Sequence, residues 1–314
     1  MLKVIVTCPP MLRNIDNVRP MFAKHNVELF TPNVVQTLSV DELKELIPQY
    51  DGWIIGDDPA NREVFQAGYA GKLRAAVKWG VGVDNVDFQA AKDLGIPIIN
   101  TPGMFGTEVS DVALGYVIAL ARETFLIDRE VKAGRWAKPT GISLAGKRAA
   151  VIGFGDIGSN VAKRLLACDM KVTVYDPFFK PRPGLEAVEN RPWAEGIEEA
   201  DFLVVTCALT KENFHMVNAE IFAKMKQGVR VVNVARGPLI DEPALIEALR
   251  SGKVYSAALD VFEAEPLAAD SPLRSFDRCI FGSHNGSNTI DAVRRTNELA
   301  VTTLFTYLGL VQPK

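Results

Sequence analysis

The chain of 314 residues is 48% hydrophobic and 23% charged, with a formal net charge of −3 at neutral pH. These proportions are typical of globular proteins, and the length allows two domains, each with its own core. Since the sequence contains no long basic run, it offers no surface suited to nucleic acid or to an anionic membrane. We expect neither as a partner.

The apolar segments are too short to act as targeting or membrane elements. Residues 1–7 predict a strand rather than a signal peptide, and Val112–Ala121 has about half the length that crosses a bilayer. The cysteines form no CxxC pair and are Cys8, Cys168, Cys207 and Cys279. We therefore expect a cytoplasmic protein with reduced thiols. No zinc or two-metal spacing is visible, and we predict no metal site.

Residues 1–100 alternate short apolar strands with helices and contain no hairpin signal. The predicted strands are Lys3–Thr7, Val27–Phe30, Trp53–Ile55, Ala75–Trp79 and Pro97–Ile99. The predicted helices are Asn17–Lys24, Ser39–Ile47, Arg62–Ala67 and Phe88–Leu94. A capping box at residues 39–42 opens the second of these helices. Such alternation favours a parallel sheet covered by helices on both faces.

A second series of strands follows a Thr101-Pro102-Gly103 break and a long apolar helix. These strands are Lys147–Ile152, Lys171–Asp176, Ala200–Thr206, Val229–Ala235, Tyr255–Asp260 and Cys279–Ser283. Six strands fit a complete doubly wound sheet, with helices such as Ala219–Met225 and Glu242–Ser251 between them. The final helix, Ile290–Leu308, has no strand left to serve there, so we expect it to return to the first domain.

The segment from residue 147 to residue 176 forms a predicted βαβ unit. Its first strand runs into the motif GFGDIG at residues 153–158, and the helix Asp156–Cys168 and a second strand follow. Glycines at this spacing are typical of dinucleotide-binding domains. An ordinary glycine-rich turn is the alternative, but the complete strand–helix–strand context favours the dinucleotide.

Each glycine of this motif has an expected task. Gly153 permits the tight turn, Gly155 lets the backbone approach a pyrophosphate, and Gly158 lets the helix lie close to the sheet. N–H groups at the start of the helix, including those of Asp156 and Ile157, would bind the phosphate charge together with the helix dipole.

Asp176 ends the second strand of this unit and favours NAD as the cofactor. A carboxylate at this place accepts hydrogen bonds from the ribose 2′-hydroxyl and repels a 2′-phosphate. The alternative is that Asp176 only opens the turn at Pro177.

Residues that follow parallel strands gather along one edge of the sheet, where ligands bind. The residues in these positions are the glycine loop, Asp176, Thr206, Cys207, Ala235, Arg236, Asp260, Glu265 and His284. We expect Thr206, Cys207, Ala235 and Asp260 to contact the cofactor. Asp260 would hold the nicotinamide carboxamide, unless it merely begins a turn.

Arg236 and His284 are the candidates for substrate chemistry. A guanidinium offers two parallel donors to a carboxylate, which suits an α-keto or α-hydroxy acid. The alternative for Arg236 is a surface ion pair with Asp241. Among the three histidines, His284 alone follows a predicted strand of the second series, and it is the best general acid or base. Its alternative is a buried structural histidine.

A carboxylate beside His284 would fix the imidazole tautomer and favour the imidazolium. Glu263 and Glu265 both lie in the segment Phe262-Glu263-Ala264-Glu265-Pro266 and compete for this task. A solvated acidic turn is the alternative for both residues.

With these residues in view, the chain resembles the D-isomer-specific 2-hydroxyacid dehydrogenases, the family that includes D-3-phosphoglycerate dehydrogenase. The resemblance covers essentially the whole chain. It depends on five motifs in the family's order, namely KWGVGVDNVD (78–87), GFGDIG (153–158), NVARGPLID (233–241), ALDVFEAEP (258–266) and SHNGSNT (283–289).

The resemblance implies a Rossmann NAD-binding domain, residues 101–284, inserted into a discontinuous flavodoxin-like substrate domain, residues 1–100 and 285–314. It implies catalysis by Arg236, Glu265 and His284, selecting Glu265 over Glu263. It also implies that backbone N–H groups of Gly80, Val81 and Gly82 hold the substrate carboxylate, although a plain glycine turn is the alternative there. The activity that the resemblance implies is hydride transfer between NAD and a D-2-hydroxy acid. The implied assembly is a homodimer formed through the nucleotide domains.

The sequence departs from the family pattern at positions that bear on the substrate. Phe105 stands where many members carry asparagine, and Gly56-Asp57-Asp58-Pro59 stands where phosphoglycerate-type members offer an arginine and hydroxyls. Two carboxylates would repel a phosphate unless Arg62 compensates. We therefore do not expect 3-phosphoglycerate as the natural substrate.

Two other functions fit parts of the pattern. A non-catalytic NAD(H)-sensing protein of the corepressor type shares this fold and can keep all three catalytic residues. A formate dehydrogenase pairs its histidine with glutamine, and Glu265 argues against that activity.

Overall fold

The computed structural model of the chain describes residues 1–312, which divide into two compact units. The first unit consists of Met1–Met104 together with the chain from Asn288 onward, and the second is Phe105–Ser287. Within the described residues, no helix is both long enough and apolar enough to cross a membrane.

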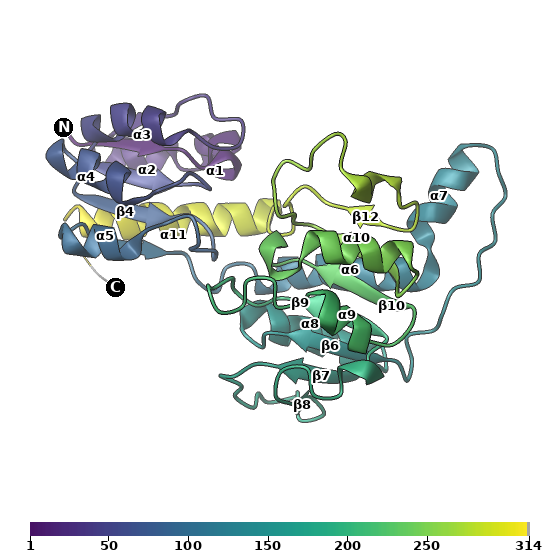
Figure 1. Cartoon of the computed structure of the whole chain (residues 1–314). Helices are drawn as coiled ribbons and strands as arrows, with labels where there is room; N and C mark the ends of the chain where they lie inside the picture. The colour runs from purple at the N-terminus through teal and green to yellow at the C-terminus, as the bar shows by residue number, and fades with distance from the viewer. Residues whose placement is uncertain (313–314) are drawn as a thin grey trace. The chain divides into compact units, whose positions relative to one another are not determined.

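The first unit contains a five-stranded parallel sheet in the order β2-β1-β3-β4-β5 (Figure 1). Its strands are β1 (Lys3–Val6), β2 (Glu28–Phe30), β3 (Gly52–Ile55), β4 (Ala75–Lys78) and β5 (Ile98–Asn100). Its helices are α1 (Pro9–Arg13), α2 (Arg19–Lys24), α3 (Val40–Leu46), α4 (Arg62–Ala70), α5 (Phe88–Asp93) and α11 (Ile290–Tyr307). This strand order is that of flavodoxin-like sheets.

Apolar residues cover both faces of this sheet. Every residue of β3 and β4 is buried, as expected for parallel strands between helices. Trp53 and Phe65 pack in the core with α3 and α4, and the predicted capping box at Ser39 and Glu42 is present. Helix α11 packs against β3 and β4, so it completes the core of the first unit.

The second unit contains a seven-stranded parallel sheet in the order β12-β11-β10-β9-β6-β7-β8 (Figure 1). Its strands are β6 (Arg148–Ile152), β7 (Lys171–Tyr175), β8 (Glu189–Asn190), β9 (Phe202–Val205), β10 (Val229–Asn233), β11 (Val254–Leu259) and β12 (Ile280–Phe281). Its helices are α6 (Gly106–Arg122), α7 (Thr124–Lys132), α8 (Asp156–Ala167), α9 (Ala219–Lys224) and α10 (Glu242–Arg250). The order matches the doubly wound dinucleotide-binding sheet with one added strand.

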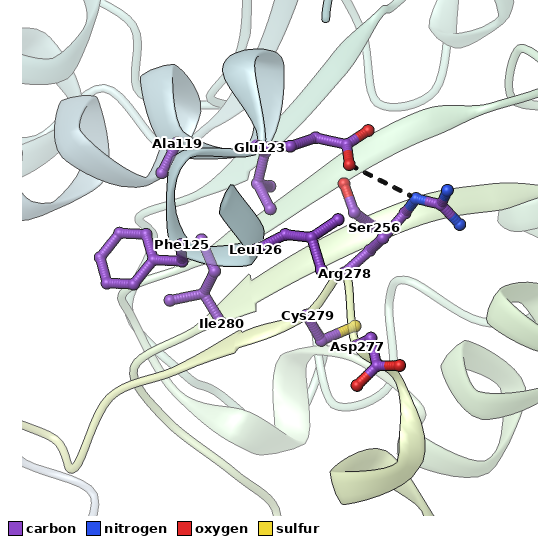
Figure 2. A pocket seen from close by; sticks show the side chains of 10 residues that line it. Ala119, Glu123, Phe125, Leu126, Ser256, Asp277, Arg278, Cys279 and Ile280 are labelled. Carbon is purple, nitrogen blue, oxygen red and sulfur yellow. Dashed lines mark ion pairs between the residues drawn. The ribbon is translucent and has the colours of Figure 1, made fainter. Parts of the chain in front are cut away.

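The junction of α6 and α7 is built around the buried Glu123, whose backbone is left-handed at φ 54°. Its carboxylate accepts a hydrogen bond from Tyr255. It also lies 3.7 Å from Arg278 Nε, and Figure 2 marks this ion pair with a dashed line. The Arg230 and Arg278 guanidinium groups lie 4.7 and 4.9 Å from the centroid of the Tyr255 ring. These contacts fix the start of α7 on β11.

A cavity of about 10 Å³ lies at this junction, lined by residues such as Glu123, Ser256 and Cys279 (Figure 2). It has room for roughly one water molecule. No residue of the glycine motif and none of the candidate catalytic residues lines it.

The predicted α/β class and its parallel sheets are confirmed. Three elements were not predicted, namely α1, α7 and β8. Helix α1 begins at Pro9-Pro10, a pair that looks like a break although proline is favoured in a first helical turn. Strand β8 is a pair of exposed polar residues, so it gives no apolar signal, and the prediction of six strands after residue 147 was one short.

Candidate functional site

The strand order of the second unit reverses at β6, which pairs with β7 on one side and β9 on the other. This is the switch point at which doubly wound sheets bind ligands. The loops that leave the carboxyl ends of these strands carry the glycine motif, Asp176 and Thr206-Cys207. The candidate cofactor residues therefore lie at one edge of one sheet.

Two glycines of the motif allow backbone to approach backbone. Gly153 has φ +91°, and a Cβ there would lie 2.8 Å from Cys207 Cα. A Cβ at Gly158 would lie 2.0 Å from the Gly153 carbonyl oxygen, so only glycine lets α8 pack this close to the loop. The expected tasks of a tight turn and of helix–sheet approach fit these positions.

Gly155 differs because its side is open. A Cβ built there meets no atom within 4 Å, and the residue is exposed at the N-cap of α8 with no side-chain cap. The helix thus presents uncapped N–H groups and its positive dipole end to an open space. The Asp156 carboxylate lies against Gly106 of α6, so this residue can offer a ligand its backbone N–H. These features fit a dinucleotide pyrophosphate.

Asp176 supports the glycine loop through hydrogen bonds to the backbone. Its carboxylate accepts hydrogen bonds from Phe154 N at 2.6 Å and from Phe178 N at 2.7 Å. A carboxylate has about four acceptor positions, which leaves capacity for a ribose hydroxyl. Thr206 Oγ1 donates to the Ile152 carbonyl at 2.8 Å. Burial raises the pKa of the Cys207 thiol to about 12, and the Cys207 backbone packs against Gly153.

The turn that carries Arg236 is shaped by the buried Asn233. Asn233 Nδ2 donates to the Arg236 carbonyl at 2.9 Å, and Asn233 Oδ1 accepts from Ala235 N at 3.0 Å. Arg236 Nη1 donates to the Ala235 carbonyl at 2.8 Å. Asp241, the partner in the alternative interpretation of Arg236, caps α10 by accepting from Ala244 N.

His284 and Glu265 are in contact. His284 Nδ1 lies 2.8 Å from Glu265 Oε2, and Glu265 Oε1 accepts from Phe262 N at 3.0 Å. The competing acid, Glu263, lies instead beside His215, with 2.7 Å between Oε1 and His215 Nε2. The structure therefore separates the two glutamates that the sequence could not. Both histidines have a left-handed backbone, at φ 55° for His284 and 53° for His215.

Asp260 holds the loop of His284. Its carboxylate accepts from Asn285 N at 3.2 Å and Gly286 N at 2.8 Å, while its carbonyl accepts from His284 N at 2.7 Å. Burial, with a smaller contribution from the Asp260 charge, raises the pKa of Tyr116 to about 12. The Asp260 side chain is thus occupied by backbone N–H groups, an arrangement that the sequence did not indicate.

In the first unit, the loop that follows β4 offers two of the three expected donors. Gly80 N donates to Thr101 Oγ1 at 2.8 Å, so this N–H is already used. The N–H groups of Val81 and Gly82 have no hydrogen-bond partner among residues 1–312. These two N–H groups are available to a ligand.

The acidic segment of the first unit does not present two free carboxylates. Asp58 is fully buried, and its carboxylate accepts from Leu38 N at 2.9 Å. Asp57 lies 3.0 Å from Nζ of the buried Lys78, and Arg62 Nη2 lies 2.9 Å from Asp93. The expected repulsion of a phosphate by both acids is therefore wrong for Asp58, and Asp57 is already neutralised in part.

Several residues that support the site were not predicted from the sequence. Thr101 and Tyr116 gave no signal, and His215 was set aside as a loop residue. Asn233 lies at the end of β10 and inside a recognised motif, so its position in the sequence could have identified it.

The family model for the NAD binding domain of D-isomer specific 2-hydroxyacid dehydrogenases matches residues 114–286. Hydroxypyruvate reductase of Thermotoga maritima is 40% identical over 278 residues, covering 87% of this chain and 90% of that protein. D-3-phosphoglycerate dehydrogenase of Archaeoglobus fulgidus is 38% identical and covers 93% of this chain, which spans only 54% of that protein. The structure of a glyoxylate reductase from Paecilomyes thermophila superposes with a TM-score of 0.85 at 27% identity, covering 99% of this chain and 96% of that one.

Gly155→Ala and Gly158→Ala test the glycine loop as a matched pair. Gly155→Ala should keep the melting temperature, because its Cβ enters open space, and weaken NADH binding at least about tenfold, because that space is where a phosphate would lie. Gly158→Ala should lower both the melting temperature and the affinity for NADH, since its Cβ meets backbone. Isothermal titration with NADH and thermal melts measure the two effects, with Gly115→Ala as a control of open surroundings. Unchanged NADH affinity in Gly155→Ala would contradict the assignment.

Proposed function

Because the chain belongs to the D-isomer specific 2-hydroxyacid dehydrogenases, we propose that it interconverts a small D-2-hydroxy acid and its 2-keto acid, with hydroxypyruvate and glyoxylate as the preferred keto acids. Membership follows from the match over residues 114–286 and from the relative that is 40% identical. The expected family, the oxidoreductase activity and NAD as cofactor are thereby confirmed.

The contact between His284 and Glu265 carries the proposal. A carboxylate on Nδ1 leaves Nε2 as the nitrogen that exchanges a proton, and it stabilises the imidazolium that forms when a proton arrives. Arg236, placed by Asn233 at the end of β10, supplies the cation that binds the substrate carboxylate. In the first unit, the N–H groups of Val81 and Gly82 are the proposed backbone donors to the substrate.

The proton balance follows from these roles. In the oxidation, His284 Nε2 takes the proton of the substrate hydroxyl while the C2–H bond breaks, and in the reduction the imidazolium returns that proton to the carbonyl oxygen. NAD, when bound, supplies the acceptor of the hydride. Glu265 keeps the imidazole oriented. Asp176, the glycine loop and Thr206 are the residues that would hold the cofactor.

Two observations favour a small, unphosphorylated acid. One relative, the hydroxypyruvate reductase of Thermotoga maritima, is 40% identical and is matched over 90% of its own length. The buried Lys78, which contacts residues 56 and 57, already pairs with Asp57. Such a segment offers little to a phosphate.

A panel of keto acids tests the activity. Purified protein with NADH should oxidise the cofactor in the presence of hydroxypyruvate or glyoxylate, with kcat/KM at least about tenfold higher than for phosphohydroxypyruvate, a preference of about 1.4 kcal/mol. Loss of NADH absorbance measures the rates. Faster turnover of phosphohydroxypyruvate would contradict the substrate class. NADH binding without turnover of any acid would favour a sensor of NAD(H).

His284→Ala tests the proton-transfer role. We expect turnover to fall by about 10²–10⁴-fold, the usual contribution of a positioned acid or base, while the NADH dissociation constant stays within about threefold. His25→Ala is the matched control, because His25 lies in the first unit against Phe305 and should keep full turnover. A His284→Ala variant with most of its turnover would remove His284 from the mechanism.

The chain is also proposed to be a cytoplasmic homodimer that associates through the second unit. Helix α7 buries none of its residues, and apolar side chains on it and after it are exposed, Phe125 by 51% and Trp136 by 77%. Exposed aromatic side chains gathered on one segment are typical of an interface. All four cysteines are free thiols, which supports a reducing compartment.

Charge at this surface should separate the subunits. Phe125→Glu combined with Trp136→Glu is expected to convert a dimer to a monomer at micromolar concentration, because carboxylates would be buried in an apolar contact. Sedimentation equilibrium measures the mass. Phe178→Glu is the control, since Phe178 is 85% exposed in the loop after β7. A monomeric parent protein, or a double variant that stays dimeric, would exclude this interface.

A further inference from the structure

His215 is the centre of a contact set that the proposed mechanism does not use. It precedes α9, in the loop that leaves β9, and its side chain is about one-third exposed. Its Nε2 lies 2.7 Å from Glu263 Oε1, and its Nδ1 lies 3.9 Å from Asp241 Oδ2. The Phe214 ring stacks on the imidazole with 3.9 Å between the centroids.

On one side, the backbone at His215 is tied to the segment that follows Arg236. His215 N donates to the Pro238 carbonyl at 2.8 Å, and Val217 N donates to the Leu239 carbonyl at 3.1 Å. Asp241 N donates back to the Val217 carbonyl at 3.0 Å. Residues 215–217 therefore run beside residues 238–241 as a short parallel bridge.

On the other side, the imidazole is tied to the segment that carries Glu265. Glu263 lies two residues before Glu265, and its carboxylate also accepts from Glu242 N at 3.0 Å. Glu263 N in turn donates to Glu242 Oε2 at 3.4 Å. The Glu242 and Glu263 carboxylates thus lie close together at the start of α10, and the His215 imidazole lies against Glu263.

The two segments also touch through their backbones. A Cβ at Gly237 would lie 1.9 Å from the Phe262 carbonyl carbon and 2.3 Å from Glu263 N. Glycine beside Arg236 therefore lets its turn press against the start of the Glu265 loop. The contact of His215 with Glu263 closes the same junction from the side chains.

We propose that His215 is a positioning residue of the dehydrogenase, which through Glu263 holds the Glu265–His284 pair in register with the turn of Arg236. This inference rests on the proposed function. His215 does not touch the reacting atoms. Its task is to fix the loop whose Glu265 orients the proton-transfer group relative to the cation that binds the carboxylate. A small displacement between such groups is costly, with about 100-fold for a misplacement near 1 Å.

A double-mutant cycle on the keto acid with the highest turnover tests the proposal. His215→Ala and Glu263→Ala should each lower kcat/KM about 10- to 100-fold, through both kcat and KM, because Glu265 and Arg236 lose their common register. The kcat/KM of the double variant should lie within about threefold of that of either single variant, because all three variants remove the same contact. NADH affinity should stay within about threefold. His215→Gln, which keeps a polar side chain beside Glu263, should recover at least part of the loss.

Two controls separate positioning from general destabilisation. Glu247→Gln changes an exposed acid of α10 and should keep full activity. Hydrogen exchange should become faster at residues 237–241 and 262–266 in the His215 and Glu263 variants, and stay unchanged in the glycine loop 153–158. Full activity of both single variants, losses that multiply in the double variant, or faster exchange throughout the unit would overturn the proposal.

The outcomes also separate this proposal from the proposed function. If the parent protein reduces no keto acid of the panel, the proposed function fails, and hydrogen exchange alone then decides whether His215 joins the two segments. If the parent protein is active and the variants are equally active, only the role of His215 fails.

Discussion

The geometry of the site depends on the hydrogen bonds that Asp260 makes to the chain after β12. Its buried carboxylate accepts two backbone N–H groups, from Asn285 and Gly286, and its carbonyl accepts the N–H of His284. Burying a carboxylate is costly unless hydrogen-bond donors replace its water. The N–H groups therefore stabilise the Asp260 carboxylate, and the carboxylate in turn fixes the loop. His284 is held there in a left-handed conformation, with its Nδ1 2.8 Å from Glu265 Oε2.

The same design recurs at the other strand ends. Asn233 shapes the turn of Arg236, and Asp176 holds the glycine loop through Phe154 N. In each case a short polar side chain at or just after a strand end makes hydrogen bonds that fix a nearby turn or loop. The groups assigned to chemistry therefore depend on side chains that themselves bond to the backbone. Even a conservative change at one of these supporting side chains would therefore displace the groups assigned to chemistry.

Much of this could be predicted from the sequence, because buried strands and strand-end positions have local signatures. The strands β1 to β7 and β9 to β12, the glycine loop and the gathering of Arg236 and His284 at one sheet edge follow from apolar runs and from parallel geometry. The exceptions have physical reasons. Strand β8 has no apolar residue, and α7 follows a left-handed glutamate that looks like a helix end.

The choice between Glu263 and Glu265 could not be made from the residues themselves. Both acids lie in one loop, and the path of the backbone before Pro266 decides which of them contacts His284. The other acid, Glu263, contacts His215 instead. Burial of Asp58 likewise depends on donors distant in sequence, such as Leu38 N. A local sequence pattern carries no information about contacts between residues this far apart in the chain. Glu265 could be selected only because it occupies the position of the family's glutamate in the motif.

The return of α11 to the first sheet has a consequence for how the protein is made. The strands β1 to β5 leave the ribosome first, yet the face they present to Leu304 and Phe305 stays uncovered until residues 290–307 have been synthesised. The second unit is a continuous stretch and can close its core earlier, since domains generally fold as units during translation. The part of the polypeptide synthesised first is thus the last to finish folding, and during that interval its exposed apolar face is prone to aggregation.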